Sequence, residues 1–138
     1  MVKLLIGEKG SGKTKRLIAQ VNEALETSKG HVICVEKDDL LRYQVSYKVR
    51  LLAASNYGIC GYDAFYGFLS GLCAGDHDVT DILIDATLKI GGRDYEELAK
   101  FLEKVARLSE LTETVFTFTV STDKGNLPES IFTYCQEV

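Results

Sequence analysis

The sequence has no long apolar run, no excess of basic residues and no closely spaced pair of cysteines. A helix that spans a bilayer needs about 18 or more consecutive apolar residues, so we expect no membrane span. The N-terminal apolar stretch ends at Gly7 and Glu8, which is too short for a secretory signal. The four cysteines are scattered, and neither histidine lies near a cysteine pair. This pattern predicts reduced thiols in a cytoplasmic protein and disfavours a zinc site.

The charge balance is slightly acidic, with a formal net charge of −4. A protein whose main partner is nucleic acid usually carries an excess of Lys and Arg, so nucleic acid is disfavoured as a partner without being excluded. One local exception is the basic group formed by Lys37, Arg42, Lys48 and Arg50. These side chains could contact nucleic acid or an acidic partner, but a solvated helix face explains them as well.

The length and the apolar pattern predict one layered domain over residues 1–138. Runs typical of buried strands alternate with stretches that repeat apolar residues at helical spacing. This alternation predicts an α/β fold: a three-layer α/β/α sandwich around a mainly parallel sheet of five or six strands, with the first strand central. The expected strands cover residues 2–6, 31–35, 57–60, 81–85 and 114–120, and the expected helices begin near Lys13, Asp38 or Asp39, Asp63 and Asp94.

The C-terminal segment allows two interpretations. Pro128 could begin a short helix over residues 129–134, because proline is well suited to the first helical position. Alternatively, residues 131–134 form a sixth strand, since isoleucine, phenylalanine, threonine and tyrosine all favour strands. The pattern does not decide between the two.

Residues 7–14 fit the pattern G-x-x-x-x-G-K-[ST] at every required position. An expected strand precedes the match and an amphipathic helix follows it, which is the context that such a loop requires. Glycines let backbone N–H groups turn inward toward phosphate oxygens, and the N-terminus of the following helix adds partial positive charge. We therefore expect a nucleoside triphosphate to bind at Gly7, Glu8, Lys9, Gly10, Ser11, Gly12, Lys13 and Thr14.

Individual roles follow from the chemistry of these side chains. Lys13 would reach the β- and γ-phosphates, which makes it a candidate catalytic residue, and the hydroxyl of Thr14 would coordinate Mg²⁺. An apolar strand that ends in an acid supplies the second magnesium residue of such sites, and the strand at 81–85 ends in Asp85. Asp85 could also be an ordinary strand-end residue. Asp81 begins the same strand, at the end away from the expected site.

Together these motifs resemble those of P-loop NTPases, and the resemblance covers most of the chain. Because Asp85 ends the fourth expected strand, the chain is similar to the RecA-like and AAA-type branch, in which another strand lies between the P-loop strand and the strand that carries the magnesium acid. Residues 57–69 are weakly similar to a segment of superfamily-one helicases. The resemblance implies that Ser121 or Thr122 senses the γ-phosphate, although a polar loop start explains both residues equally well.

The chain departs from this branch at the residue after Asp85. The branch usually has a glutamate there that orients the attacking water, whereas this sequence has Ala86. Glu36, at the end of the second expected strand, could take the place of this glutamate. The arrangement is similar to that of some RecA-like and secretion-type ATPases, which use an acid from a different strand, and we name Glu36 as a candidate catalytic residue. A solvated strand-to-helix turn is the alternative interpretation. Arg93, which follows two glycines, is the best candidate for an arginine finger from within the chain.

The sequence thus predicts an ATP-binding protein that uses Mg²⁺, with three functions open. The first is a slow ATPase, a hydrolase that acts as a nucleotide-dependent switch. The second is a kinase that transfers the γ-phosphoryl group to a small molecule or nucleotide, although an arginine-rich lid is lacking. The third is a degenerate module that binds nucleotide without hydrolysis. GTP is disfavoured because the sequence has no N-K-x-D pattern. A protein partner or a homo-oligomer remains open.

Overall fold

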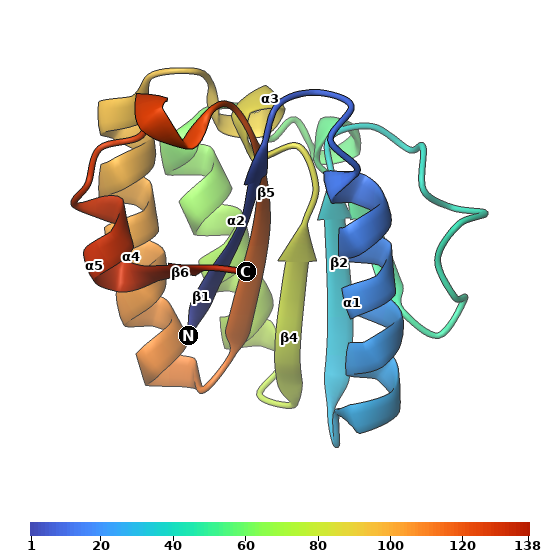
Figure 1. Ribbon diagram of the computed structural model, residues 1–138. Helices are drawn as coiled ribbons and strands as arrows, with labels where there is room; N and C mark the ends of the chain where they lie inside the picture. Colours follow the sequence, from blue (N-terminus) through green and yellow to red (C-terminus); the bar gives the residue numbers. More distant parts are fainter.

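A six-stranded, all-parallel β-sheet forms the centre of the computed structural model, which describes residues 1–138 (Figure 1). This confirms the expected α/β class and the parallel sheet. The strands lie in the order β3-β2-β4-β5-β1-β6. Their bounds are β1 Val2–Gly7, β2 His31–Glu36, β3 Arg50–Ala53, β4 Val79–Ile84, β5 Val115–Ser121 and β6 Cys135–Glu137.

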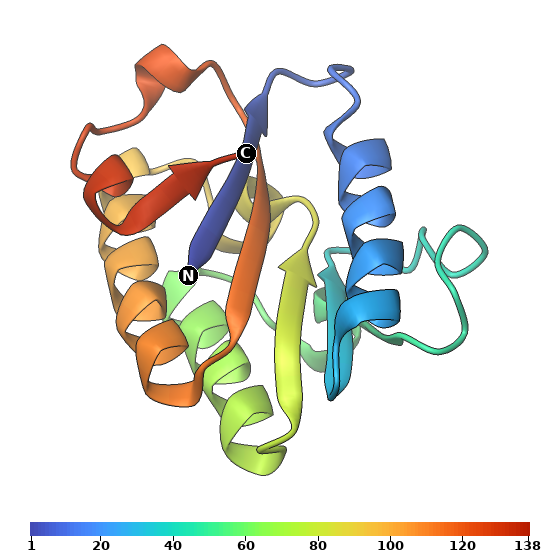
Figure 2. The same ribbon diagram turned by 60° about the horizontal axis from the view of Figure 1, so that its bottom comes forward.

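Helices lie on both faces of the sheet. Helix α1 (Lys13–Thr27) covers one face, and α2 (Tyr62–Gly75) and α4 (Tyr95–Thr112) lie side by side on the other, as Figures 1 and 2 show. None of the helices combines the length and the hydrophobicity that crossing a bilayer requires. The short helices are α3 Thr87–Gly91, α5 Ile131–Tyr134 and the 3₁₀ turns Ala54–Tyr57 and Lys124–Asn126.

Successive residues of the inner strands enter two different hydrophobic clusters. In β2, Ile33 and Val35 belong to a cluster of 26 buried residues that includes the apolar faces of α2 and α4, whereas Cys34 belongs to a cluster of nine buried residues under α1. In β4, Ile82 and Leu83 divide in the same way. A strand that is covered on both faces must be apolar on both, which explains the uninterrupted apolar runs of the sequence.

Helix α4 begins as the sequence predicts. The side chain of Asp94 accepts hydrogen bonds from the backbone N–H groups of Glu96 and Glu97, at 3.0 and 3.1 Å. These bonds satisfy donors that have no partner within the helix. The apolar stripe then packs against α2, where the rings of Phe65 and Phe101 stack with centroids 4.8 Å apart.

The prediction of a helix that begins at Asp38 or Asp39 is wrong. Residues 37–49, which we call the β2–β3 loop, form turns and irregular backbone. The carboxylate of Glu36 accepts hydrogen bonds from the N–H groups of Leu40 and Leu41, which shape the start of the loop. Leu41 and Val49, which are eight residues apart, are both buried. The apolar residues therefore do face the core, but they anchor a loop rather than a helix.

Two further strand assignments need correction. The strand expected at residues 57–60 is wrong, because β3 lies earlier, where Leu51 and Leu52 pair with Cys34 and Val35 of β2. At the C-terminus the helical interpretation is confirmed, because residues 131–134 form α5, whereas the sixth strand follows at β6 and pairs with β1. Strand β1 is interior but lies next to this edge strand, so the expectation of a central first strand is also wrong.

Strand β5 lies between β1 and β4. Gly7 at the end of β1 pairs with Ser121 at the end of β5, and Ile84 at the end of β4 pairs with Phe118. In a parallel sheet the carboxyl ends of all strands meet at one edge, and this is where ligands usually bind in such sheets. The register therefore brings the segments that follow β1, β4 and β5 to a common edge.

A glycine at the start of β2 permits a close backbone contact. A Cβ atom on Gly30 would overlap the carbonyl oxygen of Asp78, the same oxygen that accepts a hydrogen bond from His31 N–H at 2.8 Å. We expect Gly30→Ala to lower the free energy of unfolding by about 1–3 kcal/mol, because backbone must move to make room. Urea denaturation monitored by circular dichroism measures this change.

Gly71 is the matched control, because a Cβ atom there would meet nothing within 4 Å in the middle of α2. Alanine at this helical position should raise the free energy of unfolding by about 0.5–1 kcal/mol. Equal effects of the two substitutions would contradict the close contact at Gly30.

Candidate phosphate-binding site

The segment between β1 and α1 turns sharply through two glycines. Gly10 has a φ of +88° and Gly12 a φ of +86°, both in the left-handed region that other residues rarely adopt. In Figure 1 this segment is the loop that connects the top of β1 to the top of α1. The structure thus places the predicted loop of residues 7–14 at the carboxyl edge of the sheet.

Several backbone donors of this loop have no acceptor within the protein. Ser11 N–H donates to the carbonyl oxygen of Glu8 at 3.1 Å, whereas the N–H groups of Gly10, Gly12, Lys13 and Thr14 donate to no backbone acceptor. Unpaired N–H groups at the start of a helix, together with the positive end of the helix dipole, favour an anion. The loop therefore presents a cluster of donors suited to phosphate oxygens.

Lys13 lies over this cluster rather than in solvent. Its side chain is only 6% exposed, and its ammonium group donates to the carbonyl oxygen of Glu8 at 2.9 Å and contacts Ser11 Oγ at 3.4 Å. Burial lowers the pKa of Lys13, and the nearby Asp85 carboxylate opposes that shift. No carboxylate pairs directly with the ammonium group, so an anion bound in the loop would supply its missing partner.

The Asp85 carboxylate is held by two threonines. Thr14 Oγ1 lies 3.2 Å from both Asp85 oxygens, and Thr119 Oγ1 donates to Asp85 Oδ1 at 2.8 Å. The structure thus brings Thr14 and Asp85 together, as the sequence predicts for a magnesium site. A hydroxyl and a carboxylate are the oxygen ligands that Mg²⁺ prefers, so this pair fits the ion. In such a site the ion would neutralise phosphate charge.

Thr119 was missed by the sequence analysis. Besides donating to Asp85, its hydroxyl accepts a hydrogen bond from Ala86 N–H at 2.8 Å. Only the register of the sheet could have indicated this role of Thr119. The pairing of Ile84 with Phe118 places the next residues, Asp85 and Thr119, side by side. That register depends on the strand order, which the sequence pattern does not show.

The chain turns sharply directly after Asp85. Ala86 has a φ of +66°, a left-handed conformation that is unfavourable for a residue with a Cβ atom. The turn begins α3, which carries Lys89, and Arg93 follows two residues after the helix. Both cations line the same cleft as the phosphate loop. Lys89 was not singled out from the sequence.

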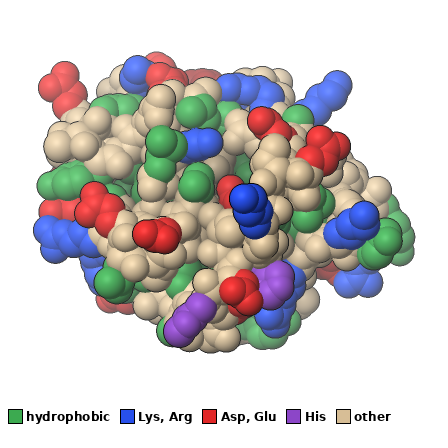
Figure 3. Space-filling model, turned by 90° about the horizontal axis from the view of Figure 1, so that it is seen from below, with side chains coloured by type: hydrophobic (Ala, Val, Ile, Leu, Met, Phe, Trp, Pro, Cys, Tyr) green, Lys and Arg blue, Asp and Glu red, His purple; other side chains and the backbone are tan.

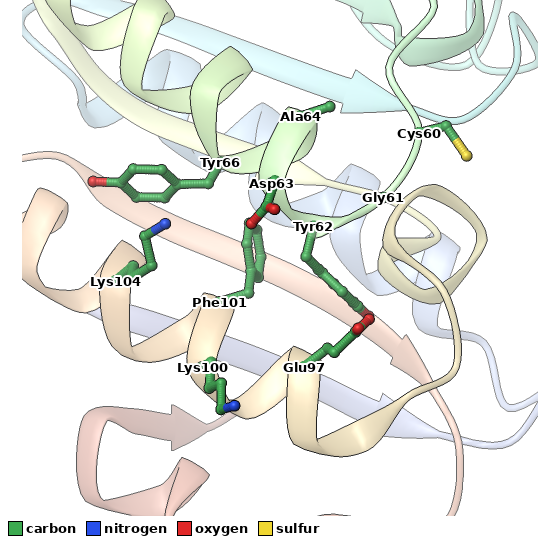
Figure 4. Close-up of a pocket in the computed structure, with 10 residues that line it drawn as sticks. All are labelled: Cys60, Gly61, Tyr62, Asp63, Ala64, Tyr66, Glu97, Lys100, Phe101 and Lys104. Atoms are coloured by element: carbon green, nitrogen blue, oxygen red, sulfur yellow. The ribbon is translucent and has the colours of Figure 1, made fainter.

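Helix α3 is fixed from below by α2. Gly61 N–H donates to the carbonyl oxygen of Ile90 at 2.9 Å, and the hydroxyl of Tyr62 donates to that of Gly92 at 2.7 Å. Burial, with the nearby Glu97 carboxylate, raises the pKa of Tyr62 and keeps this hydroxyl a donor. Figure 4 shows Tyr62 in the cavity of about 520 Å³ between α2 and α4. This cavity shares no lining residue with the cleft around the phosphate loop.

The cleft around the phosphate loop has a volume of about 690 Å³ and a cationic lining. Five of its side chains are basic and one is acidic, in a chain whose net charge is −4. None of the basic side chains forms an ion pair within the protein. Such a cleft favours a polyanion. The basic residues are Lys9, Lys13, Lys15, Lys89 and Arg93, and the acid is Asp85.

Glu36 lies on the wall of a smaller cavity next to this cleft. The cavity, of about 280 Å³, shares Thr14 and Asp85 with the cleft. The Glu36 side chain is 3% exposed, and its Oε1 accepts hydrogen bonds from the N–H groups of Leu40 and Leu41 at 2.9 and 3.1 Å. The structure therefore brings Glu36 near the predicted magnesium residues, but its carboxylate also anchors the β2–β3 loop.

The two candidates for a γ-phosphate sensor occupy different environments. Ser121 lines the cleft, next to Gly7 in the paired strands. Thr122 is buried outside the cleft lining, and its hydroxyl bonds to Tyr95 Oη at 2.8 Å and to Asn126 Nδ2 at 3.2 Å. Of the two, Ser121 has the position that contact with a phosphate requires.

At the opposite edge of the sheet, His31, Asp76 and Asp78 form a small cluster. Figure 3 shows histidine and acidic side chains together on this face. His31 Nδ1 lies 2.6 Å from Asp76 Oδ2, and Asp78 N–H donates to Asp76 Oδ1 at 2.9 Å. Both carboxylate oxygens of Asp76 are thus engaged, Oδ1 in a local turn and Oδ2 by His31 from the start of β2. The hydrogen bond from His31 lowers the pKa of Asp76.

The cysteines are all free, and three of the four are buried. Burial raises the pKa of Cys34 to about 12 and that of Cys135 to about 12, so neither is a reactive thiolate. No protein-family model and no curated protein matches the sequence.

Replacing Thr119 tests the anchor of the Asp85 carboxylate. Thr119→Val keeps the shape of the side chain but removes the hydroxyl that serves both Asp85 and Ala86 N–H. We expect the free energy of unfolding to fall by about 1–3 kcal/mol, because buried polar groups lose their partner. Thr117→Val is the matched control, since Thr117 is also buried in β5 but its hydroxyl is in none of these bonds. Equal losses in thermal denaturation would contradict the anchoring role of Thr119.

The buried carboxyl group of Glu36 makes the stability of the protein depend on pH. Burial raises its pKa, with added repulsion from Asp39 and Asp85, while the N–H groups of Leu40 and Leu41 act in the opposite direction. Above the ordinary glutamate pKa of about 4.3, the folded state then binds more protons than the unfolded state, so stability falls as pH rises.

We therefore expect the stability of the wild type, relative to Glu36→Gln, to decrease as pH rises from about 4 through the raised pKa. The amide oxygen of glutamine can still accept the Leu40 and Leu41 hydrogen bonds, so the variant should keep its fold. Urea denaturation of both proteins across this pH range measures the difference. A difference that does not change with pH would contradict a raised Glu36 pKa.

Proposed function

We propose that the protein is a P-loop NTPase that binds ATP with Mg²⁺ in the cationic cleft. The observation that carries the proposal is the loop of free N–H donors at residues 7–14, with Lys13 lying over it and the Thr14–Asp85 pair beside it. In this assignment the loop and Lys13 hold the β- and γ-phosphates. Thr14 and Asp85 would hold the magnesium ion.

The arrangement of the sheet supports this assignment. In the RecA-like branch, which the motifs resemble, one strand separates the P-loop strand from the strand of the magnesium acid. Here β5 lies between β1 and β4. With α1 on one face and α2 and α4 on the other, the fold is consistent with the three-layer P-loop architecture.

We further propose that ATP turnover is slow. Ala86 supplies no carboxylate next to Asp85, and positioning of the attacking water contributes much of the rate of phosphoryl transfer. Glu36 is the available acid, but its carboxylate already accepts two backbone hydrogen bonds. The cations Lys89 and Arg93 would stabilise charge on the phosphates. Slow turnover suits a nucleotide-dependent switch, and complete absence of turnover would make the protein a binding module.

Lys13 provides the direct test of the site. We expect Lys13→Ala to weaken binding of ATP, measured by calorimetry with Mg²⁺, by at least about tenfold, because a buried cation facing the phosphates is lost. Lys29→Ala is the matched control, since Lys29 is an exposed lysine outside the cleft. Equal binding of ATP by wild type and Lys13→Ala would rule out this site.

Single-turnover measurement separates the switch from the binding module. ADP formed by the wild type over minutes to hours, and lost in Lys13→Ala, supports slow hydrolysis. If Glu36 positions the water, Glu36→Gln should bind ATP normally while forming ADP at least about tenfold more slowly. ATP that stays intact in the wild type would contradict the proposed turnover but leave the proposed binding standing.

The smaller cavity favours one alternative, a small-molecule kinase. It adjoins the cleft at Thr14, Asp85 and Lys89, where the γ-phosphate of the proposed complex would lie. Its volume of about 280 Å³ and its polar residues, among them Asp38 and Gln44, suit a small acceptor. A thermal-shift screen with ATP analogue and candidate acceptors tests this function, which requires a larger shift for the pair than for either compound alone.

A further inference from the structure

The β2–β3 loop exposes more aromatic surface than any neighbouring segment. Tyr43 is 95% exposed and Tyr47 is 92% exposed, and Leu40 is 73% exposed. Figures 1 and 2 show this loop extending away from the body of the molecule beyond the edge of the sheet. Tyrosine rings in full contact with water contribute nothing to the core and are free to contact a partner.

The loop is anchored at regular intervals, so this exposure is built into the fold. Leu41 and Val49 are buried in the cluster under α1, and Val45 packs against that cluster. Val45 N–H donates to the carbonyl oxygen of Leu41 at 3.2 Å, within the same turn. Each tyrosine lies two residues after an anchoring residue, and the anchors therefore direct both rings outward.

Basic side chains lie on either side of the two tyrosines in the sequence. Arg42 and Lys48 flank them in sequence, and Arg50 follows at the start of β3, all exposed. Arg42 pairs with Asp39 at 2.7 Å, whereas Lys48 and Arg50 form no ion pair. Counting Lys37 and Asp38 as well, residues 37–50 hold four basic and two acidic side chains, against the net charge of −4 for the whole chain. The loop is thus a local cationic surface on an acidic protein.

We propose that the β2–β3 loop binds single-stranded nucleic acid, with Tyr43 and Tyr47 stacking on bases and Lys48 and Arg50 contacting phosphates. Unpaired bases expose their π-faces on a flexible backbone. Proteins bind such strands with aromatic side chains that stack on the bases and with cationic side chains that contact the phosphates. Protein interfaces also use tyrosine and arginine, so the test below includes a polyanion without bases, which separates an acidic protein partner from a nucleic acid.

This proposal does not rest on ATP binding. Neither tyrosine lines the cleft, although Gln44 of the same loop does. A failure of the Lys13→Ala experiment would therefore leave the loop proposal untouched. Likewise, a loop that binds no nucleic acid would leave the cleft assignment untouched.

The test uses the full chain and a fluorescently labelled oligothymidine of about 20 nucleotides, in about 50 mM salt. We expect fluorescence anisotropy to show binding that weakens as salt increases, because the phosphate contacts release counterions. Since the protein has no tryptophan, its emission comes from tyrosine, and the part of the quenching that is lost in Tyr43→Ala and Tyr47→Ala, after correction for absorption by the oligonucleotide, reports stacking on these two rings. Each of Tyr43→Ala and Tyr47→Ala should weaken binding by about 5-fold or more, the effect of one lost base stack.

Tyr134→Ala is the matched control, because Tyr134 is also exposed but lies on α5, away from the loop. It should bind the oligonucleotide like the wild type, and all three variants should keep their thermal stability. Lys48→Gln with Arg50→Gln should reduce the salt dependence. This pattern of losses would support the proposal.

The proposal would be overturned by no binding of the oligonucleotide at low salt, by binding that is unchanged in the Tyr43→Ala and Tyr47→Ala variants, or by equal binding of polyglutamate. The last result would identify an acidic protein surface as the partner, because polyglutamate has charge but no bases. Equal affinity for duplex DNA of the same length would likewise contradict stacking, since paired bases do not offer their faces.

Discussion

The Asp85 carboxylate is the group on which the arrangement of the candidate site depends. It follows β4, while the phosphate loop follows β1, and β5 lies between these two strands. The gap is closed at the strand ends by hydroxyl groups: Thr14 reaches the carboxylate from α1 and Thr119 reaches it from β5. These hydrogen bonds fix the acid beside the loop. An ion placed there would meet oxygen atoms that are already close together.

Local sequence and tertiary packing agree in most of the elements that carry this site, and those elements could be predicted. Strands β1 and β4 are apolar on both faces, so their apolar runs were unambiguous, and β5 alternates buried apolar residues with the buried threonines Thr117 and Thr119. Asp94 begins α4 with a side-chain cap, and the glycines at 10 and 12 adopt the left-handed backbone that their motif needs. Each of these signals lies within a few residues of the structure that it determines.

The failures involve partners that are distant in the sequence. In the β2–β3 loop, the burial of Leu41 and Val49 imitates a helical period, whereas the backbone follows the Glu36 carboxylate instead. Strand β3 is defined by its pairing with β2, which no local pattern reports. The role of Thr119 depends on the strand order, because a threonine in β5 matters to Asp85 only when β5 is the neighbour of β4. The sequence therefore indicated the residues with the chemistry of the site more fully than the residues that hold them in place.

Binding and turnover place different demands on this site, and the chain meets them unequally. Binding needs free donors and unpaired cations, and both are present around Lys13. Turnover needs an ionised group that orients water, yet Ala86 offers none and its N–H is already bonded to Thr119. Glu36 is buried with a raised pKa, so its ionised form is less favourable than that of an ordinary glutamate. The ATP site that we propose is therefore better suited to retaining the nucleotide than to hydrolysing it quickly.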